Sequence, residues 1–182
     1  MDISREYLRS PKQDRRKKRK DIMNKLKYLG YSIVFQEVPD EVTLAINISG
    51  CPHKCEGCHS KYLWEYEGNY ISDDLDGLIE KYKGLITCVC FMGGDQNPGD
   101  LHRCIYKVKD NNLKVALYTG LDNVAFLGGI LEKCDYIKYG HYNAKLGGLD
   151  CATTNQIMIK MNHETSHWED ITYKFQKGYR NG

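Results

Sequence analysis

The sequence predicts an α/β protein built on a parallel sheet. Strand-like segments alternate along the chain with segments that have the apolar periodicity of a helix, as in successive β-α-β units. One of the strand-like segments, residues 85–92, is almost continuously apolar, which is typical of a strand covered on both faces. The chain has 182 residues, of which 41% are hydrophobic and 27% charged, so it is large and apolar enough to form one cored domain.

The first predicted elements lie between residues 42 and 92. Residues 42–49 alternate apolar with small or polar side chains, as a half-buried strand does, and end at Gly50. A helix is expected to begin at Ser72, a candidate cap followed by two acids, and to end at Gly84. Its core-facing side chains recur at helical spacing: Leu75, Leu78, Ile79 and Tyr82. The apolar strand at 85–92 follows.

The same pattern repeats towards the C-terminus. Asp100 is expected to cap a second helix, and residues 114–119 are expected to form the next strand. The apolar side of that helix is formed by Leu101, Cys104, Ile105 and Val108. A third helix is expected from Asp122 or Asn123, weakened by its two central glycines. Short strands at 136–139 and 156–160 complete the series.

These elements predict a sheet of five or six strands, arranged as a partial parallel (βα) barrel or open half-barrel. Such sheets bind ligands beyond the carboxyl ends of their strands. Three segments with candidate functional residues fall at those ends: a cysteine-rich loop at 51–58, Gly93-Gly94-Asp95 and Thr119-Gly120. We therefore expect a single site built from these three segments.

The formal net charge of +2 conceals a basic N-terminal arm. Residues 1–27 hold eleven Lys/Arg and four Asp/Glu, so the remainder of the chain is net acidic. Clustered cations can bind nucleic acid by releasing counterions from phosphate, but neither a groove-reading motif nor interleaved aromatic residues accompany the run at 15–20. The interpretation favoured here is a solvated tail, helical or disordered, followed by one domain over residues 28–182, with no nucleic-acid partner.

The start of the chain and its hydropathy predict a cytoplasmic protein. The first residues are charged and do not have the pattern of a signal peptide. No apolar run approaches the ~18 residues that a membrane-spanning helix needs. We therefore expect neither secretion nor a membrane partner.

Seven of the eight cysteines fall into two classes. Four lie in apolar runs and are expected to pack as small buried hydrophobes: Cys88, Cys90, Cys104 and Cys134. The role of Cys151 stays open, as does any response of Cys88, Cys90 or Cys151 to oxidation. The remaining three have the spacing C-x3-C-x2-C: Cys51, Cys55 and Cys58.

Three thiolates on one short loop can converge on a metal centre. Soft sulfur ligands favour zinc or an iron–sulfur cluster. Structural zinc needs a fourth ligand, which His53 or His59 would have to supply, and no second C-x2-C pair exists in the chain. A 4Fe–4S cube held by three cysteines instead keeps one iron open to another ligand. The spacing favours iron–sulfur over zinc without excluding zinc.

The spacing, together with the segments that follow it in order, resembles the radical S-adenosylmethionine (SAM) superfamily. Within it, the match is nearest to the activating proteins of anaerobic (class III) ribonucleoside-triphosphate reductases. The segments concerned are Ile48-Ser49-Gly50-Cys51, Cys58 with Lys61-Tyr62-Leu63-Trp64, Met92-Gly93-Gly94-Asp95, Tyr118-Thr119-Gly120 and Thr153-Thr154-Asn155-Gln156. The resemblance covers about residues 31–162. It departs from many radical SAM proteins at Gly57, where they carry an aromatic residue.

The resemblance implies a set of cofactor-binding residues. Cys51, Cys55 and Cys58 would hold three irons of a 4Fe–4S cluster, and SAM would chelate the fourth. The implied SAM contacts are the following: Gly93 and Gly94, which allow close backbone approach to the methionine part; Asp95, near the amino group; Thr119, in the same pocket; and Gly57, Cys58 and His59, on the adenine side.

The resemblance also implies an activity and partners. The expected reaction is reductive cleavage of SAM to a deoxyadenosyl radical, which installs a glycyl radical on the catalytic subunit of the anaerobic reductase. A flavodoxin- or ferredoxin-type protein would supply the electron, and no catalytic side chain is expected beyond the cluster and SAM. Two alternatives stay open: a radical SAM enzyme acting on a different glycyl-radical enzyme, peptide or small molecule, and a zinc module that binds nucleic acid.

Overall fold

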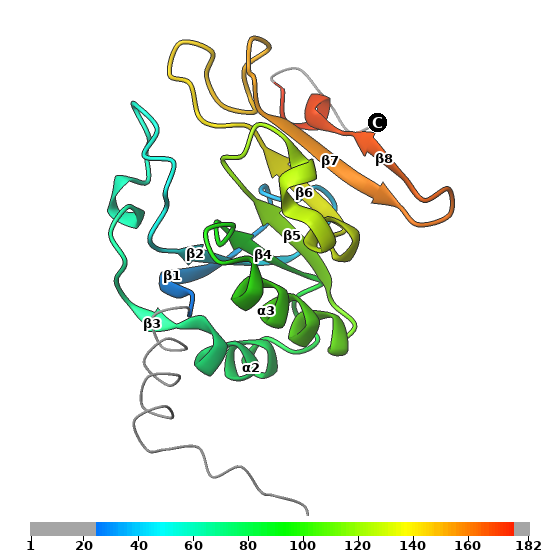
Figure 1. Cartoon of the computed structure of the whole chain (residues 1–182). Helices are drawn as coiled ribbons and strands as arrows, with labels where there is room; N and C mark the ends of the chain where they lie inside the picture. The colour runs from blue at the N-terminus through cyan, green and yellow to red at the C-terminus, as the bar shows by residue number, and fades with distance from the viewer. Residues whose placement is uncertain (1–24, 177–182) are drawn as a thin grey trace, which may run out of the picture.

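The computed structural model of the chain describes residues 25–176. These residues form one eight-stranded sheet with the strand order β3-β1-β2-β4-β5-β6-β7-β8 (Figure 1). The strands are β1 (Lys27–Val34), β2 (Thr43–Ile48), β3 (Asn69–Tyr70), β4 (Cys88–Met92), β5 (Lys114–Tyr118), β6 (Tyr136–Tyr139), β7 (Ile157–Asn162) and β8 (His167–Asp170). The described helices are α2 (Ile71–Lys81), α3 (Pro98–Asp110) and the 3-10 helices η1 (Lys61–Leu63), η2 (Val124–Lys133) and η3 (Thr172–Phe175). Most of the predicted basic arm, residues 1–24, lies outside the described residues, but Leu26 is buried and Lys27 already belongs to β1.

The sheet is mixed, with a parallel centre. Strands β2, β4, β5 and β6 pair in parallel, whereas β1 and β3 on one side and β7 and β8 on the other pair antiparallel. The five predicted strands correspond to β2, β4, β5, β6 and β7. The expected count of five or six is too low, because β1, β3 and β8 are short or only partly buried and lack a clear alternating pattern.

The predicted cap of the first helix, Ser72, is wrong by two residues. Helix α2 begins at Ile71, after the extended residue Tyr70, and the Ile71 N–H donates to the Leu26 carbonyl. Ser72 therefore lies inside the first turn, where its hydroxyl donates to Asp73 at 3.1 Å instead of capping the helix. The backbone of a distant segment has replaced the local side-chain cap.

The second helix also begins earlier than predicted. Asn97 is its cap and accepts from the Asp100 N–H at 3.2 Å, while Pro98 occupies the first turn, where its missing N–H costs nothing. The buried Asp100 carboxylate instead accepts from the Leu26 N–H at 2.6 Å and from the Arg103 guanidinium. Asp100 thus joins α3 to the entry of β1, a contact that no local pattern could reveal.

The third predicted helix is a kinked 3-10 segment. Asn123 does cap η2, because its side chain accepts from the Ala125 N–H at 2.8 Å. Gly128 interrupts the segment with φ 53° and ψ −132°, a conformation that favours glycine. The paired glycines therefore change the type of the helix as well as weakening it.

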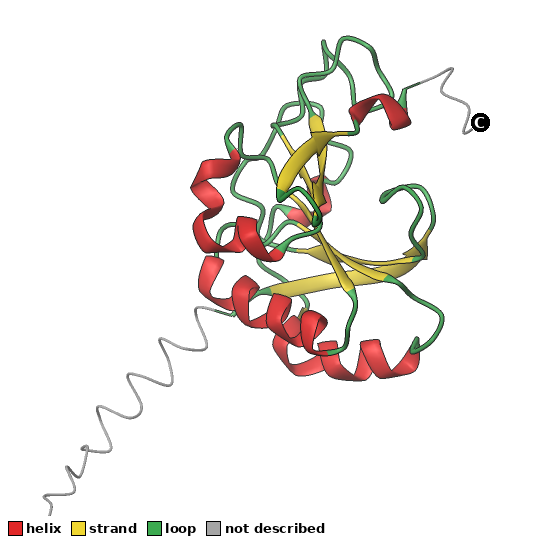
Figure 2. Ribbon diagram, turned by 90° about the vertical axis from the view of Figure 1, so that its right-hand side faces the viewer, coloured by secondary structure: helices red, strands yellow, loops and turns green. Residues whose placement is uncertain are grey.

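The two faces of the sheet have different coverings. Helices α2 and α3 lie against one face (Figure 2), where large apolar side chains of the strands, such as Ile46, Phe91 and Leu117, join the main core. The opposite face packs in a second, smaller core, which includes Cys90, Ala116 and Tyr136. None of the helices within residues 25–176 is long and apolar enough to cross a membrane.

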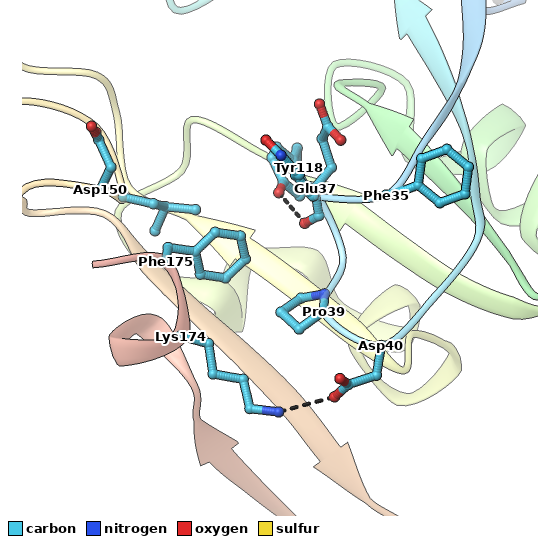
Figure 3. A pocket seen from close by; sticks show the side chains of 10 residues that line it. Phe35, Glu37, Pro39, Asp40, Tyr118, Asp150, Lys174 and Phe175 are labelled. Carbon is cyan, nitrogen blue, oxygen red and sulfur yellow. Dashed lines mark hydrogen bonds and ion pairs between the residues drawn. The ribbon is translucent and has the colours of Figure 1, made fainter. Parts of the chain in front are cut away.

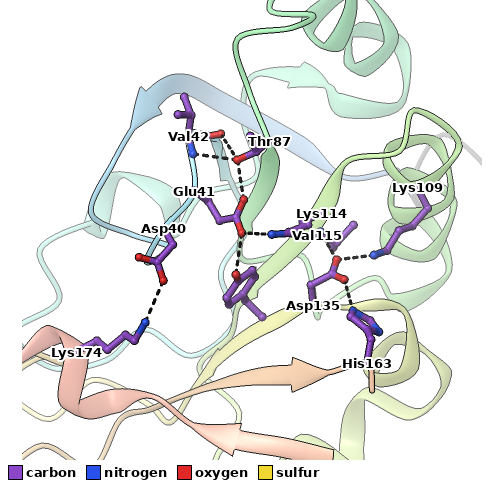
Figure 4. A network of polar contacts seen from close by, with 11 residues as sticks. Asp40, Glu41, Val42, Thr87, Lys109, Lys114, Val115, Asp135, His163 and Lys174 are labelled. Atoms are coloured by element: carbon purple, nitrogen blue, oxygen red, sulfur yellow. Dashed lines mark hydrogen bonds and ion pairs between the residues drawn. The ribbon is translucent and has the colours of Figure 1, made fainter. Parts of the chain in front are cut away.

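Two buried carboxylates stabilise the amino ends of the parallel strands (Figure 4). Glu41 accepts from the Thr87 hydroxyl at 2.6 Å, the Tyr136 hydroxyl at 2.8 Å and the Lys114 ammonium. Asp135 accepts from the Val115 N–H at 2.7 Å and pairs with both Lys109 and His163. These networks join β4, β5 and β6 at the edge opposite the cysteine loop, which leaves the carboxyl ends available for a site.

Candidate functional site

A row of four side chains crosses the sheet at the carboxyl ends of its parallel strands. Asn47 of β2 is in register with Met92 of β4, Met92 with Tyr118 of β5, and Tyr118 with Lys138 of β6. All four line one cavity of about 180 Å³. Because neighbouring parallel strands place equivalent residues side by side, the sheet itself forms the base of this cavity.

The cysteine loop forms another wall of the cavity. Cys51, Cys55 and Cys58 all line it, together with His53. The loop turns sharply at Gly57, which has φ 74°, and an added Cβ there would lie 3.0 Å from the Cβ of Ala144. Glycine is therefore favoured at this position by backbone conformation and by the approach of the loop that follows β6.

The three loop cysteines have the chemistry that an iron–sulfur cluster needs. None of the eight cysteines forms a disulfide, and the three in the loop are partly exposed. Within residues 25–176, no group of three or more His, Cys, Asp or Glu side chains is already arranged around a metal position. The thiols thus share one cavity, and metal binding must draw them together, as expected where ligand binding and local folding are coupled.

The glycine pair after β4 forms the turn beside the loop. Gly93 and Gly94 have φ values of 107° and 111°, which side chains rarely adopt. The Gly93 N–H donates to the Tyr118 carbonyl at 2.9 Å, and Gln96 accepts from the Gly94 N–H at 3.1 Å while donating to the Ser49 carbonyl at 2.9 Å. The turn is thereby fixed to the ends of both β2 and β5.

Asp95 connects the three segments that the sequence predicted as one site. Its Oδ2 lies 2.9 Å from His53 Nε2 in the cysteine loop and accepts from the Thr119 hydroxyl at 2.9 Å. The Asp95 side chain is 6% exposed, and that of His53 is 19% exposed. The sequence pointed to Asp95 and Thr119, but His53 entered only as a candidate zinc ligand, since nothing local shows which residue it contacts.

Other predicted residues lie around this cavity. Gly93 lines it with Asp95 and Thr119, whereas Gly57, Gly94 and His59 line neither it nor the adjoining cavity of about 560 Å³. The side chain of His59 is exposed, and its ring centroid is 5.6 Å from that of Tyr142, which lines both cavities. Tyr142 therefore contributes an aromatic side chain to both cavities.

Lys138 brings a cation to the cavity that holds the thiols. Its amine donates to the Gly140 carbonyl at 3.1 Å. Burial lowers the pKa of this amine to about 8, and the charges of Cys55 and Cys58 oppose that decrease. Lys138 is therefore a largely buried amine of this cavity, whereas Asp135, which precedes β6, belongs to the network at the opposite edge of the sheet.

A further cavity of about 540 Å³ adjoins the site at Tyr118 (Figure 3). Tyr118 lines both this cavity and the cavity of the thiols, and its hydroxyl donates to the Glu37 carbonyl. Phe35 and Phe175 line the outer part, where Asp40 and Lys174 form an ion pair of 3.0 Å. The two cavities therefore lie on either side of Tyr118.

The two classes of cysteine are expected to differ sharply in reactivity. Burial raises the pKa of Cys104 and Cys134 to about 12 and that of Cys88 and Cys90 above the usual range. At neutral pH a thiol with a pKa near 12 holds on the order of 10³-fold less thiolate than an ordinary one. Iodoacetamide should therefore modify Cys51, Cys55, Cys58 and Cys151 of the folded, metal-free protein and leave the buried four, as read by peptide mass spectrometry.

Cluster loading provides the control for this experiment. Iron and sulfide should protect the three loop cysteines and leave Cys151 reactive. Rapid modification of Cys104 in the folded protein, or protection of Cys151 by the cluster, would contradict the assignment of the two classes.

Comparison with known protein families gives a match that includes the cysteine loop. Residues 41–158 match the family model described as a 4Fe-4S single cluster domain. No curated protein and no solved structure matches the chain. The matched segment covers more than half of the chain and includes the cysteine loop, both neighbouring turns and Lys138. The chain therefore belongs to the family of 4Fe-4S single cluster domains.

Proposed function

We propose that this protein is a radical SAM enzyme that installs a glycyl radical on an anaerobic ribonucleoside-triphosphate reductase. One observation carries the proposal: the three thiols, the glycine turn with Asp95, and Thr119 all meet at one cavity at the carboxyl ends of adjacent parallel strands. The family match supports the cluster. The fold we propose is the partial barrel of radical SAM proteins, extended by antiparallel strands at both sides.

The residues present fit a 4Fe–4S cluster with an open iron. Cys51, Cys55 and Cys58 would hold three irons, since they offer three soft thiolates on one loop. A closed zinc site would need a fourth ligand, and His53, the candidate that lines the cavity of the thiols, contacts Asp95 instead. When bound, the cluster supplies the electron that cleaves SAM into methionine and a deoxyadenosyl radical, which abstracts hydrogen from a glycine of the partner.

The chain's own residues bind and orient SAM. The backbone of Gly93 allows the methionine part to approach closely, because no side chain projects there. Asp95 presents a carboxylate to the SAM ammonium group, and Lys138 places a positive charge near the thiolates. The adenosine part extends into the cavity of about 560 Å³, towards Tyr142.

The cavity at Tyr118 gives the partner a route to the site. It adjoins the cavity of the thiols and has a volume of about 540 Å³, enough for a short polypeptide segment rather than a whole domain. We propose that the glycine-bearing loop of the reductase enters here. A flavodoxin- or ferredoxin-type protein is the proposed electron donor.

The test is a glycyl-radical assay with the purified partner. The protein is reconstituted anaerobically with iron and sulfide, reduced, and mixed with SAM and the reductase subunit. We expect equal amounts of methionine and deoxyadenosine and the EPR doublet of a glycyl radical. Deoxyadenosine without that doublet would favour a different substrate, and failure to cleave SAM would contradict the radical SAM assignment itself.

A further inference from the structure

The contacts of His53 give this histidine a role that its position inside the cysteine motif does not explain. It lies between the first two cysteines of C-x3-C-x2-C, yet its ring nitrogen Nε2 points to a residue 42 positions further along the chain. A carboxylate can only accept, so the proton of this hydrogen bond is on Nε2 of His53. The cysteine loop is therefore bonded directly to the Gly-Gly-Asp turn.

The two donors to Asp95 converge on a single oxygen. His53 Nε2 and Thr119 Oγ1 both lie 2.9 Å from Oδ2. Within residues 25–176, Oδ1 of Asp95 has no hydrogen-bond partner, although the side chain lines the cavity. The pair of donors thus fixes the rotamer of the carboxylate and leaves one oxygen to accept from a ligand.

Gly120 shows how closely the ring is held. An added Cβ at Gly120 would lie 2.6 Å from both Cδ2 and Cγ of His53, closer than real Cβ contacts. The backbone of Gly120 does not have a positive φ, so its conformation does not require glycine. Glycine is needed here because a side chain would occupy the position of the His53 ring. The ring is held by Asp95 through a hydrogen bond and by Gly120 through contact.

We propose that His53 is a positioning residue that docks the cysteine loop on the Thr119–Gly120 turn and orients Asp95 Oδ1 towards a ligand ammonium group. This inference rests on the proposed function, in which SAM supplies that ammonium. Through His53, the loop that would hold the cluster contacts Asp95, which would bind SAM. The position of the loop and the orientation of Asp95 therefore depend on each other.

The test compares three variants of the cluster-loaded protein. His53→Leu removes the donor, His53→Gln retains an N–H at nearly the same reach, and Gly120→Ala displaces the ring without altering it. SAM affinity is measured by equilibrium dialysis against the oxidised cluster, which does not cleave SAM. We expect about a tenfold weaker affinity for His53→Leu and for Gly120→Ala, with unchanged iron content, and substantial recovery in His53→Gln.

A double variant and a measurement of amide hydrogen exchange, which does not depend on activity, complete the test. Because both changes remove the same contact, His53→Leu and Gly120→Ala together should cost no more than either alone. In the metal-free protein, His53→Leu should increase amide hydrogen exchange over residues 51–59. The matched control is His167→Leu, which changes an exposed histidine of β8. It should alter neither the affinity for SAM nor the hydrogen exchange of residues 51–59.

The outcomes separate this inference from the proposed function. Wild-type affinity for SAM in both His53→Leu and Gly120→Ala would overturn the positioning role and leave the radical SAM assignment intact. Absence of SAM binding by the cluster-loaded wild-type protein would overturn the proposed function instead. Additive losses in the double variant would show that the two residues act separately and would also overturn the inference.

Discussion

Replacing Cys51, Cys55 or Cys58 by alanine is expected to abolish stable cluster binding and, with it, all SAM cleavage. Each thiol is one of three on the loop, and a cube left with two protein ligands loses the coordination that retains it. Iron and sulfide content after anaerobic reconstitution and desalting measures the first effect, and deoxyadenosine formation measures the second. The iron and sulfide content and the rate of deoxyadenosine formation should both fall to the values measured for protein that received no iron.

The control for this prediction is a cysteine elsewhere in the chain. Cys104 is fully buried on α3 and lines none of the cavities described above. Cys104→Ala should destabilise the fold by about 1 kcal/mol through lost packing and leave the cluster in place. Loss of the cluster in Cys104→Ala, or its retention in Cys55→Ala, would contradict the ligand assignment.

Glu41→Ala is expected to lower the free energy of unfolding by about 3 kcal/mol. The Glu41 side chain is 2% exposed and accepts from Lys114, Thr87 and Tyr136. Lys114 is half exposed and can return to water, but the hydroxyl of the buried Tyr136 would have no acceptor. Burial and the hydrogen bond to Glu41 both raise the pKa of Tyr136, in keeping with a hydroxyl that donates to Glu41.

Urea unfolding followed by circular dichroism measures this prediction. Glu41→Gln, which keeps an acceptor without the charge, should lose less stability than Glu41→Ala. Glu80→Ala is the matched control, because Glu80 of α2 forms an exposed ion pair with Lys83, which follows the helix, and should contribute less than about 1 kcal/mol. An equal free energy of unfolding for Glu41→Ala and Glu80→Ala would show that the buried network does not stabilise the sheet.

The sequence predicts the parallel centre of this fold well because its strands are buried on both faces. Such strands have apolar runs, and α2 and α3 have clear helical periodicity, so both kinds of element can be recognised locally. The peripheral strands β1 and β8 do not have a continuous apolar run, because most of their residues are exposed or only partly buried. The caps expected at Ser72 and Asp100 were wrong for other reasons. The first N–H of α2 donates to the distant Leu26 carbonyl. In α3 the side chain of Asn97 is the cap, and the Asp100 carboxylate accepts from the Leu26 N–H.

The residues of the candidate site were likewise predictable only where a local pattern marks them. Cysteine spacing and glycine pairs are local signals, and they identify the loop at 51–58 and the turn at 93–95. The contribution of Asn47, Lys138 and Tyr142 depends on strand register and on the loop after β6, which only the folded chain reveals. The contact of His53 with Asp95 is likewise a tertiary contact, so the sequence could name both residues but could not pair them.

The most direct test of the central claim is the EPR spectrum of the reduced, reconstituted protein before and after addition of SAM. The claim is that three cysteines of one loop hold a 4Fe–4S cluster whose remaining iron is open to SAM. We predict about four iron and four sulfide per chain and a cluster spectrum that changes when SAM binds, since SAM would become a ligand. Zinc in place of iron, or a cluster whose spectrum is unaffected by SAM, would contradict it.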